Sequence, residues 1–307
     1  MEYFALLGNV NRSILKVDFG SGFKVESIEV EDFIHFCNEN LVFNDVENKM
    51  DYPWSCLQSY SEPPSNKVYV IKKHLPDYPI FEGGWGDLDS RISNLPKERE
   101  FEESVSSYIN HKLNLLRLLS DGDIKVAFEV FYREVDGEIE TISASECDKT
   151  SCNQMFSLFY SDYGLVNSFL CKHSIETLPK YIRFALSNYE KSYFTNHIEF
   201  DFLALMIALE AIFNDSKSEL TLRVSRGCAV LLGKDEEDAK QMFKQVKQFY
   251  EKRSKLVHTG DIGLISKRDV HELRFIVSRA LFKVMGLNLP KHELSSKLIM
   301  KWFGESW

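Results

Sequence analysis

The sequence predicts an α+β protein of two domains, a mixed strand-rich domain over residues 1–174 followed by an all-α helical bundle over residues 175–307. A chain of 307 residues exceeds the usual size of one domain. Strand-like alternation is confined to the first half, and from about Leu178 onward apolar residues recur at helical spacing. The two halves also differ in net charge. Residues 1–176 hold 16 Lys and Arg against 30 Asp and Glu and are acidic, whereas residues 177–290 hold 18 against 14 and are mildly basic.

The first domain is expected to open with a hairpin. Residues 13–19 and 23–30 alternate apolar and polar side chains on either side of the turn signal Gly20-Ser21-Gly22. Further along, the pattern predicts a strand at 68–71, a helix at 102–119, and strands at 124–133 and 138–143 joined by a turn at Asp136-Gly137. The pattern leaves the sheet topology open.

The second domain is expected to be a bundle of antiparallel helices, because the connections between its helical segments are short and polar. The expected helices are residues 178–192, 197–214, 219–232, 235–258 and 267–285. The tail from Pro290 to Trp307 is expected to add one short helix that packs through Ile299, Trp302 and Phe303.

Composition narrows the kind of protein. Hydrophobic residues make up 44% of the chain, enough for packed cores, and no apolar run approaches the length of a membrane span. The start Met1-Glu2-Tyr3 lacks the basic region of a secretion signal, so we expect a cytoplasmic protein with no membrane partner.

The six cysteines form no CxxC pair, which fits a reducing compartment. A zinc site built from Cys147, Cys152, Cys171 and His173 is conceivable, but the spacing is irregular. We expect no metal and no cofactor.

An arginine and a histidine near the end of the 235–258 helix are candidate catalytic residues. Arg253 falls on the apolar stripe, and His258 falls in the last turn before Gly260. The stripe is made of Ala239, Met242, Phe243, Val246, Phe249, Tyr250, Leu256 and Val257. Chance alone gives about 0.3 such Arg–His pairs at one separation, so context decides. The alternatives are an arginine in an internal ion pair and a histidine that caps the helix.

Two further charged residues are candidates for supporting roles. Glu210 interrupts a helix that is apolar nearly all round, so its carboxylate requires a partner, with Arg253, Arg223 and Arg226 as choices. Arg226 shares a face with Leu222 and Ala229. A polar network that links these helices is expected, with a structural role as open as a catalytic one.

Lysines flank the same helix as Arg253 and His258. Such a row is usually a solvated face, but beside a phosphate site it steers RNA electrostatically. The lysines expected to do so are Lys247, Lys252 and Lys255.

Three sequence blocks together resemble the HEPN superfamily, particularly its Apea-like branch. They are Ala-Leu-Glu-Ala-Ile-Phe at 208–213, Arg-Val-Ser-Arg-Gly-Cys-Ala-Val-Leu-Leu-Gly at 223–233, and Tyr-Glu-Lys-Arg-Ser-Lys-Leu-Val-His-Thr-Gly at 250–260. The resemblance covers roughly residues 178–290. Arg253 and His258 match the family's arginine–histidine motif, but Ser254 follows the arginine where many members have Asn, Asp or His.

The resemblance implies a homodimer in which the motifs of two subunits form a metal-independent endoribonuclease. Its products are a 2′,3′-cyclic phosphate and a 5′-hydroxyl, with His258 transferring protons and Arg253 stabilising charge. Such proteins are commonly toxins or antiviral effectors, so the N-terminal domain is expected to sense a regulatory protein or a phage-derived trigger. The alternatives are a non-catalytic HEPN module that binds a nucleotide or protein, and a helical scaffold in which Arg253 and Glu210 form an ion pair.

Overall fold

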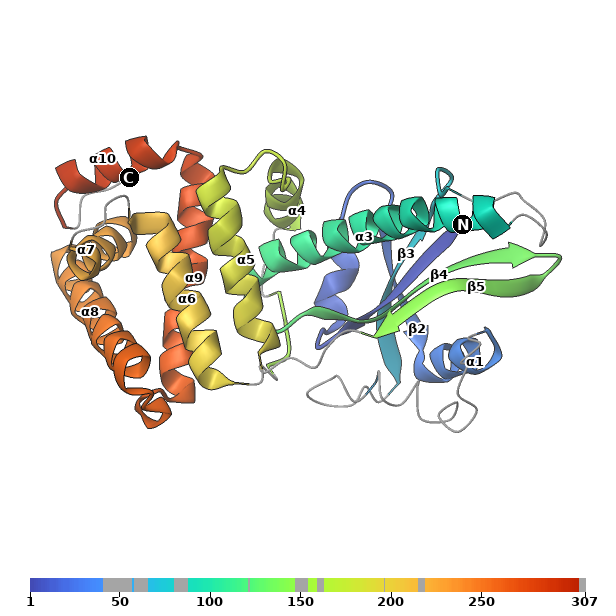
Figure 1. Cartoon of the computed structure of the whole chain (residues 1–307), viewed down its shortest axis with the longest axis horizontal. Helices are drawn as coiled ribbons and strands as arrows, with labels where there is room; N and C mark the ends of the chain where they lie inside the picture. Colours follow the sequence, from blue (N-terminus) through green and yellow to red (C-terminus); the bar gives the residue numbers. More distant parts are fainter. Residues whose placement is uncertain are drawn as a thin grey trace. The chain divides into compact units, whose positions relative to one another are not determined.

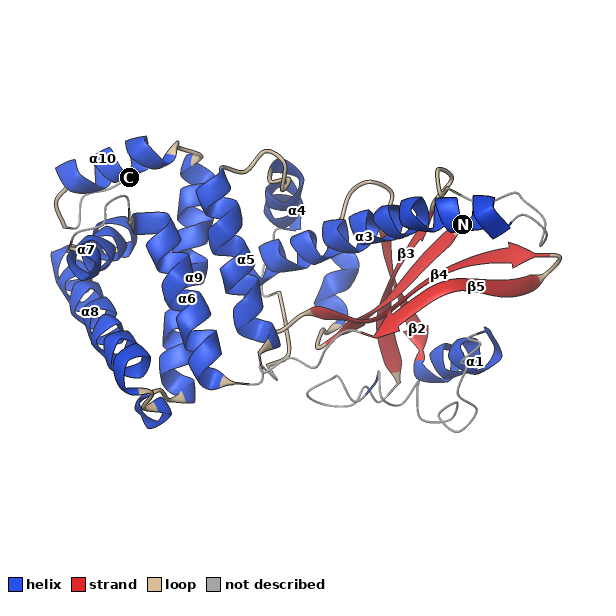
Figure 2. Ribbon diagram, in the orientation of Figure 1, coloured by secondary structure: helices blue, strands red, loops and turns tan. Residues whose placement is uncertain are grey.

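The computed structural model describes residues 1–40, 57, 66–79, 88–120, 122–146, 154–158, 163–195, 197–214 and 219–303. The chain forms two compact units, one of Met1–Lys149 with Asn153–Lys172 and the other of Thr150–Cys152 with His173–Trp307. The first contains an antiparallel sheet, and the described part of the second is helical (Figure 1 and Figure 2). The α+β layout predicted from the sequence is confirmed.

The sheet of the first unit has five strands in the order β2-β3-β1-β4-β5, and every neighbouring pair is antiparallel. The strands are β1 (Glu2–Gly8), β2 (Lys24–Glu29), β3 (Lys67–His74), β4 (Lys125–Val135) and β5 (Glu138–Glu146). The predicted β4–β5 turn is present, with Asp136 at φ 56° and Gly137 at φ 85°, the left-handed conformation that tight hairpin turns require.

The central strand β1 was not predicted from the sequence. Its residues Tyr3 to Leu7 are all buried, because it has a neighbour on each side and a helix over each face of the sheet. A strand buried on both faces reads as a continuous apolar run without alternation, so its pattern gave no strand signal.

The expected hairpin over residues 13–30 is wrong in its first half. Residues Arg12–Lys16 form a 3-10 helix, η1, which begins where the Asn11 side chain accepts a hydrogen bond from the Ser13 backbone N–H at 2.9 Å. The turn at 20–22 is present, and its three residues have positive φ, but it joins η1 to β2. The second expected strand ends at Glu29, and helix α1 (Val30–Asn40) follows directly.

Two helices cover opposite faces of the sheet (Figure 1). On one face α1 packs through Phe33 and Cys37 against Phe128 and Val130 of β4. On the other face lies α3 (Leu88–Leu119), which contains the predicted helix and extends it toward the N-terminus. Its Ser106 hydroxyl donates to Glu129, which alternates along β4 with the residues facing α1. A short helix, α4 (Tyr163–Lys172), ends this unit and was not predicted.

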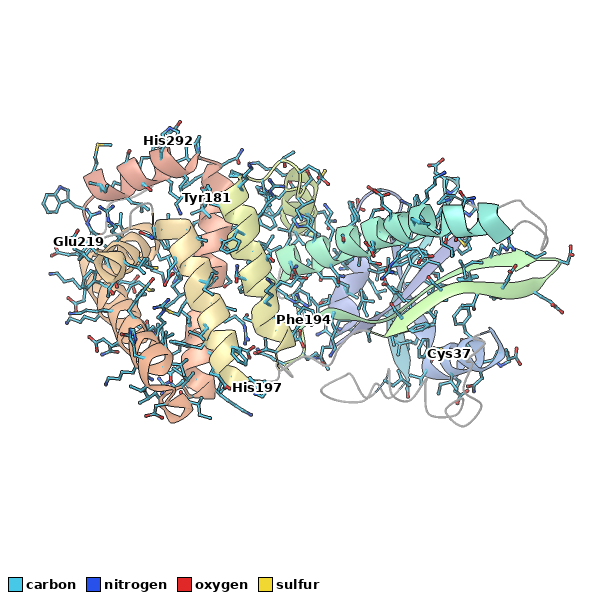
Figure 3. All side chains as sticks on the ribbon, in the orientation of Figure 1. Cys37, Tyr181, Phe194, His197, Glu219 and His292 are labelled. Atoms are coloured by element: carbon cyan, nitrogen blue, oxygen red, sulfur yellow. The ribbon has the colours of Figure 1, made fainter. Side chains whose placement is uncertain are left out.

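The helices of the second unit lie close to the predicted ranges. They are α5 (Lys180–Phe194), α6 (Ile198–Phe213), α7 (Leu220–Leu232), α8 (Glu236–Thr259), α9 (Lys267–Leu287) and α10 (Lys291–Met300). Capping side chains define two starts, since Asp235 accepts from the Asp238 N–H before α8 and Ser266 forms a capping box with Asp269 before α9. Tyr181 of α5, labelled in Figure 3, donates to the Leu289 carbonyl oxygen at 2.9 Å.

The expected packing face of the tail is largely wrong. Ile299 and Trp302 are 61% and 78% exposed, whereas Leu294 and Leu298, one turn apart, are buried. Of the three residues expected to pack, Phe303 makes an aromatic contact, with its ring centroid 6.2 Å from that of Phe243. The tail beyond residue 303 lies outside the described residues.

Close packing of α6 against α7 depends on Gly227, which yields a prediction. A Cβ at this position would lie 2.5 Å from Cδ1 of the buried Phe213. Gly227→Ala should therefore lower the free energy of unfolding by about 1–3 kcal/mol, measured by urea denaturation. Gly286→Ala in α9 is the matched control, because nothing lies within 4 Å of its added Cβ. That change should stabilise the helix by about 1 kcal/mol, and equal effects at both sites would contradict the packing argument.

Candidate functional site

The sequence candidates gather on the second half of α8, which ends at Gly260. Gly260 adopts the left-handed conformation (φ 69°), and its N–H bonds to the Leu256 carbonyl oxygen at 3.0 Å. Most of the predicted apolar stripe of α8 is buried, from Ala239 to Leu256. The predicted place of Val257 on the buried stripe is wrong, because its side chain is 51% exposed.

Arg253, Glu210 and Tyr250 form a polar cluster between α8 and α6. Arg253 Nε lies 3.9 Å from Glu210 Oε1, and the Tyr250 hydroxyl donates to the same oxygen at 3.1 Å. Burial, and then the charge of Glu210, raise the pKa of Tyr250 well above its usual range, so this phenol is a neutral donor. Of the cations the sequence offered, Arg253 is therefore the one that contacts Glu210. The Arg253 side chain is 33% exposed, so it is not sealed in the bundle.

His258 is exposed in the last turn of α8. Within the described part of the chain, its ring has no hydrogen-bond or ion-pair partner, and the helix is closed by Gly260 instead. The histidine is therefore free to interact with a ligand, and the capping alternative has no support from its contacts.

Arg253 and His258 point to different sides of α8. Five helical residues rotate by about 500°, so their side chains diverge by about 140° around the axis. His258 instead shares a face with Ser254 and Lys247, which are seven residues apart and exposed. A single α8 thus separates the two candidate catalytic groups, and one phosphate reaches both only with a second subunit or a large rearrangement of Arg253.

The lysines expected to steer RNA differ in their surroundings. Lys247 and Lys255 are exposed, but Lys252 Nζ donates to Asp269 Oδ1 at 2.7 Å. Burial raises the pKa of Asp269, but hydrogen bonds from Lys252 and Ser266 outweigh it and lower that pKa below its usual value. Lys252 is thus paired with Asp269, but its side chain is 36% exposed, so its part in steering RNA stays a prediction.

Arg226 is not part of the Glu210 cluster. Its guanidinium donates to the carbonyl oxygens of Leu298, of Ile299 at 2.9 Å and of Lys301 at 2.8 Å, at the end of α10. These are carbonyl groups that a helix terminus leaves without internal partners. These contacts tie Arg226 to the end of α10, which agrees with the structural role that the sequence left open for it.

An exposed apolar stripe on α6 adjoins the Glu210 cluster and was not singled out from the sequence. Phe200 and Ile207 are 54% and 38% exposed, and Leu203, Ala204 and Ala211 are partly exposed on the same face. Glu210 lies at one edge of this stripe, where Arg253 meets it. The signal in the sequence was a helix apolar on all sides, which indicates a second partner for the face turned away from the core.

The metal alternative gains no support in the described residues. Cys147 and Cys152 lie outside them, Cys171 is exposed and His173 is buried. The described residues contain no group of three or more His, Cys, Asp or Glu side chains arranged to hold a metal ion.

Among the described helices, none combines the length and apolar character needed to cross a membrane.

Comparisons of the chain with protein-family models, with curated proteins and with solved structures found no match.

Proposed function

We propose that this protein is a HEPN-type, Apea-like endoribonuclease that acts as a homodimer and needs no metal. The observation that carries the proposal is an exposed His258 that has no partner among the described residues, at the end of the lysine-bearing face of α8. Arg253, five residues earlier on another side of the helix, is 33% exposed and thus accessible to a second subunit. A histidine titrates near neutral pH and an arginine binds phosphate oxygens bidentately. RNA cleavage without a metal requires proton transfer and stabilisation of the phosphorane charge, and these two side chains are able to supply both.

In the proposed reaction the ribose 2′-oxygen attacks the adjacent phosphorus. The 2′-O–P bond forms and the P–O5′ bond breaks, which leaves a 2′,3′-cyclic phosphate and a 5′-hydroxyl. His258 transfers the proton released by the 2′-hydroxyl, and the leaving 5′-oxygen gains a proton. Arg253 stabilises the charge on the phosphorane, Ser254 donates to a phosphate oxygen, and Lys247 and Lys255 attract the RNA.

The second copy is proposed to pack on the exposed stripe of α6. This stripe is continuous with Glu210 and hence with Arg253, and Val257 extends the apolar surface onto α8. A two-fold axis near these residues brings His258 of the partner subunit toward Arg253 of the first. It also covers the apolar side chains that one bundle leaves exposed.

Cleavage of RNA with divalent metals chelated tests the proposal. The purified protein is incubated with mixed structured RNAs beside a double variant, Arg253→Ala with His258→Ala, and the product ends are identified. Cyclic-phosphate ends made only by the unmodified protein are expected, from a species that sizes as a dimer at micromolar concentration. Equal cleavage by both proteins, cleavage by neither, or a monomer would overturn the proposal.

The second candidate is a non-catalytic HEPN module that binds a nucleotide or a protein at the same surface. The contact between Arg253 and Glu210 favours it, because an arginine already paired with a carboxylate is less available to a phosphorane. In either case we propose that residues 1–174 regulate the bundle, by recognising a regulatory protein or a phage-derived trigger.

A further inference from the structure

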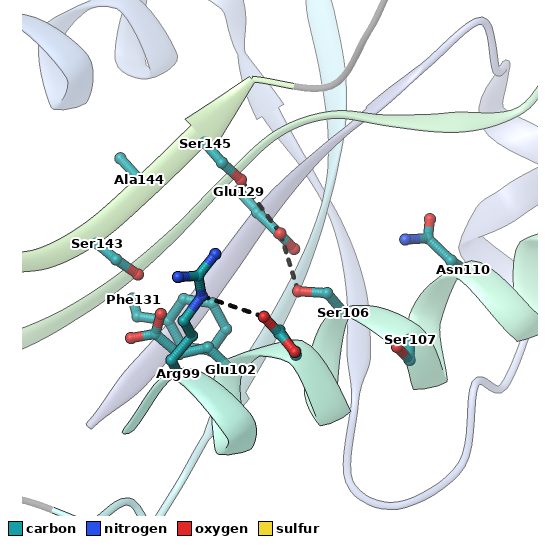
Figure 4. Close-up of a pocket in the computed structure, with 11 residues that line it drawn as sticks. Arg99, Glu102, Ser106, Ser107, Asn110, Glu129, Phe131, Ser143, Ala144 and Ser145 are labelled. Carbon is teal, nitrogen blue, oxygen red and sulfur yellow. Dashed lines mark hydrogen bonds and ion pairs between the residues drawn. The ribbon is translucent and has the colours of Figure 1, made fainter. Parts of the chain in front are cut away.

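A pocket of about 520 Å³ lies in the first unit between α3 and the hairpin of β4 and β5 (Figure 4). This volume is large enough for a small molecule, and the site is open to solvent, since Arg99, Glu103, Ser107 and Ser145 in its lining are exposed. None of its lining residues belongs to the proposed RNA site, so the pocket requires its own explanation.

The pocket has two walls that present polar side chains to each other. One is a face of α3, where Arg99, Glu102, Ser106 and Asn110 recur at spacings of three and four residues. The other comes from β4 and β5, where the register sets Glu129 opposite Ser145 and Phe131 opposite Ser143. Directly opposed residues of antiparallel strands project from the same face of the sheet.

The Glu129 carboxylate is held by three neutral donors. The Ser106 hydroxyl donates to Oε1 at 2.8 Å, the Ser145 hydroxyl to Oε1 at 3.2 Å, and the Tyr3 hydroxyl to Oε2 at 3.0 Å. A carboxylate has about four acceptor positions, so one remains for a ligand. No Lys, Arg or His among the described residues forms an ion pair with Glu129, so its charge is oriented by hydroxyls but not neutralised.

The charge of the lining is negative overall. Glu102, Glu103 and Glu129 stand against Arg99, whose Nε contacts Glu103 Oε1 at 3.2 Å. Glu102 receives a hydrogen bond from the neutral Tyr78 hydroxyl at 2.7 Å. Two carboxylates thus lack a cation in the described part of the chain.

Three further lining side chains, Ser107, Asn110 and Ser143, have no hydrogen-bond partner among the described residues. A ligand that complements the site brings positive charge and several polar hydrogen-bonding groups.

We propose that this pocket binds a cationic N–H donor, an ammonium or guanidinium group carried by a polar molecule. Phosphates, nucleotides and nucleic acid are disfavoured, because they bring negative charge against uncompensated carboxylates. The cation comes from a free polyamine or from a basic side chain of a protein. The inference does not depend on RNA cleavage by the second unit, since binding is measured directly.

Calorimetric titration of the full chain with spermidine, with the peptide acetyl-Gly-Arg-Gly-amide and with adenosine monophosphate tests the proposal. Salt at 0.15 M screens unspecific attraction of cations to a chain of net charge −9. Saturable binding of one cationic probe per chain is expected, with no binding of the nucleotide. Binding of spermidine alone identifies a free polyamine as the ligand class, and binding of the peptide alone identifies a protein side chain.

Two variants place the binding in the pocket. Glu129→Gln removes one charge while keeping the shape, and should weaken binding at least about tenfold. Glu134→Gln, on the same strand but outside the pocket, should leave it unchanged. Ser143→Phe fills the pocket without altering its charge and should abolish binding. If Glu129→Gln does not fold, this second variant shows whether the cation binds in the pocket. Binding of the nucleotide, no binding of either cation, or cation binding that survives both pocket variants would overturn the proposal.

Discussion

Replacement of His258 by alanine should slow the RNA cleavage proposed above by about 10²–10⁴-fold, the usual contribution of a positioned proton-transfer group. The same change should alter the free energy of unfolding by no more than about 0.5 kcal/mol. Its ring is exposed and has no partner in the described part of the chain, and Gly260 rather than His258 ends α8. A loss of activity would therefore report on chemistry and not on folding.

Single-turnover cleavage at saturating protein, together with urea unfolding, measures the two effects separately. His292→Ala is the matched control, because its side chain is 81% exposed and lies on α10, away from α8 in sequence. It should leave the cleavage rate unchanged. If His258→Ala cleaves as fast as the His292 variant, the histidine has no catalytic role and the binding-module alternative stands.

Arg253 is a less specific probe than His258 because it has a structural contact as well. Removing its guanidinium takes a cation from Glu210, which then keeps only the hydrogen bond from Tyr250 among the contacts described above. Ion pairs at this exposure contribute about 0–1 kcal/mol, so the structural effect is small but not zero. The scaffold alternative rests on this pair, and it predicts a stability effect from Arg253 with no activity to lose.

The bundle was predictable from sequence because its helices bury one face and signal their ends. The period of apolar residues located α5 to α9 closely, and Gly260 and the Ser266–Asp269 capping box fix two boundaries. Single positions were less predictable. Val257 fits the helical period but is 51% exposed. Periodicity alone does not show which positions of a face are covered by a neighbouring element.

The first unit was less predictable because its key contacts join residues distant in sequence. β1 pairs with β3, 62–72 residues away, and with β4, 117–130 residues away, and neither partner can be read from the local pattern. The alternation at residues 13–19 indicated a strand, but the Asn11 side chain caps a 3-10 helix there. Such local hydrogen bonds compete with strand formation and leave little trace in hydrophobic pattern.

The candidate site was predicted in its residue types but not in its pairing. Sequence left Glu210 with three possible arginines, and the contacts select Arg253, while Arg226 and Lys252 are occupied by the α10 carbonyl groups and by Asp269. Long flexible side chains choose partners through tertiary geometry, which spacing does not encode. The hydroxyl-lined pocket around Glu129 was equally hidden, since Tyr3, Ser106 and Ser145 come from three separate segments.

Replacement of Arg117 by alanine should lower the free energy of unfolding of the first unit by about 3–5 kcal/mol, the usual cost of breaking a buried ion pair. The side chains of Arg117 and Asp123 are 2% and 0% exposed, and Nη2 lies 3.7 Å from Asp123 Oδ1. Arg117 also donates to Asn114 Oδ1 at 2.5 Å and to the Ile124 carbonyl oxygen at 2.6 Å, which fixes the entry to β4. Alanine would leave a buried carboxylate without this cation.

Hydrogen exchange of the β1 and β4 amides measures this effect, because these protons report on the first unit alone. Arg99→Ala on the same helix is the control, since Arg99 and Glu103 form an i,i+4 pair with side chains 81% and 69% exposed. Loss of this exposed pair should lower the free energy of unfolding by no more than about 0.5 kcal/mol. Equal protection in both variants would mean that the unit tolerates the buried charge of Asp123, by admitting water or by protonating the carboxylate, and that Arg117 does not hold α3 to β4.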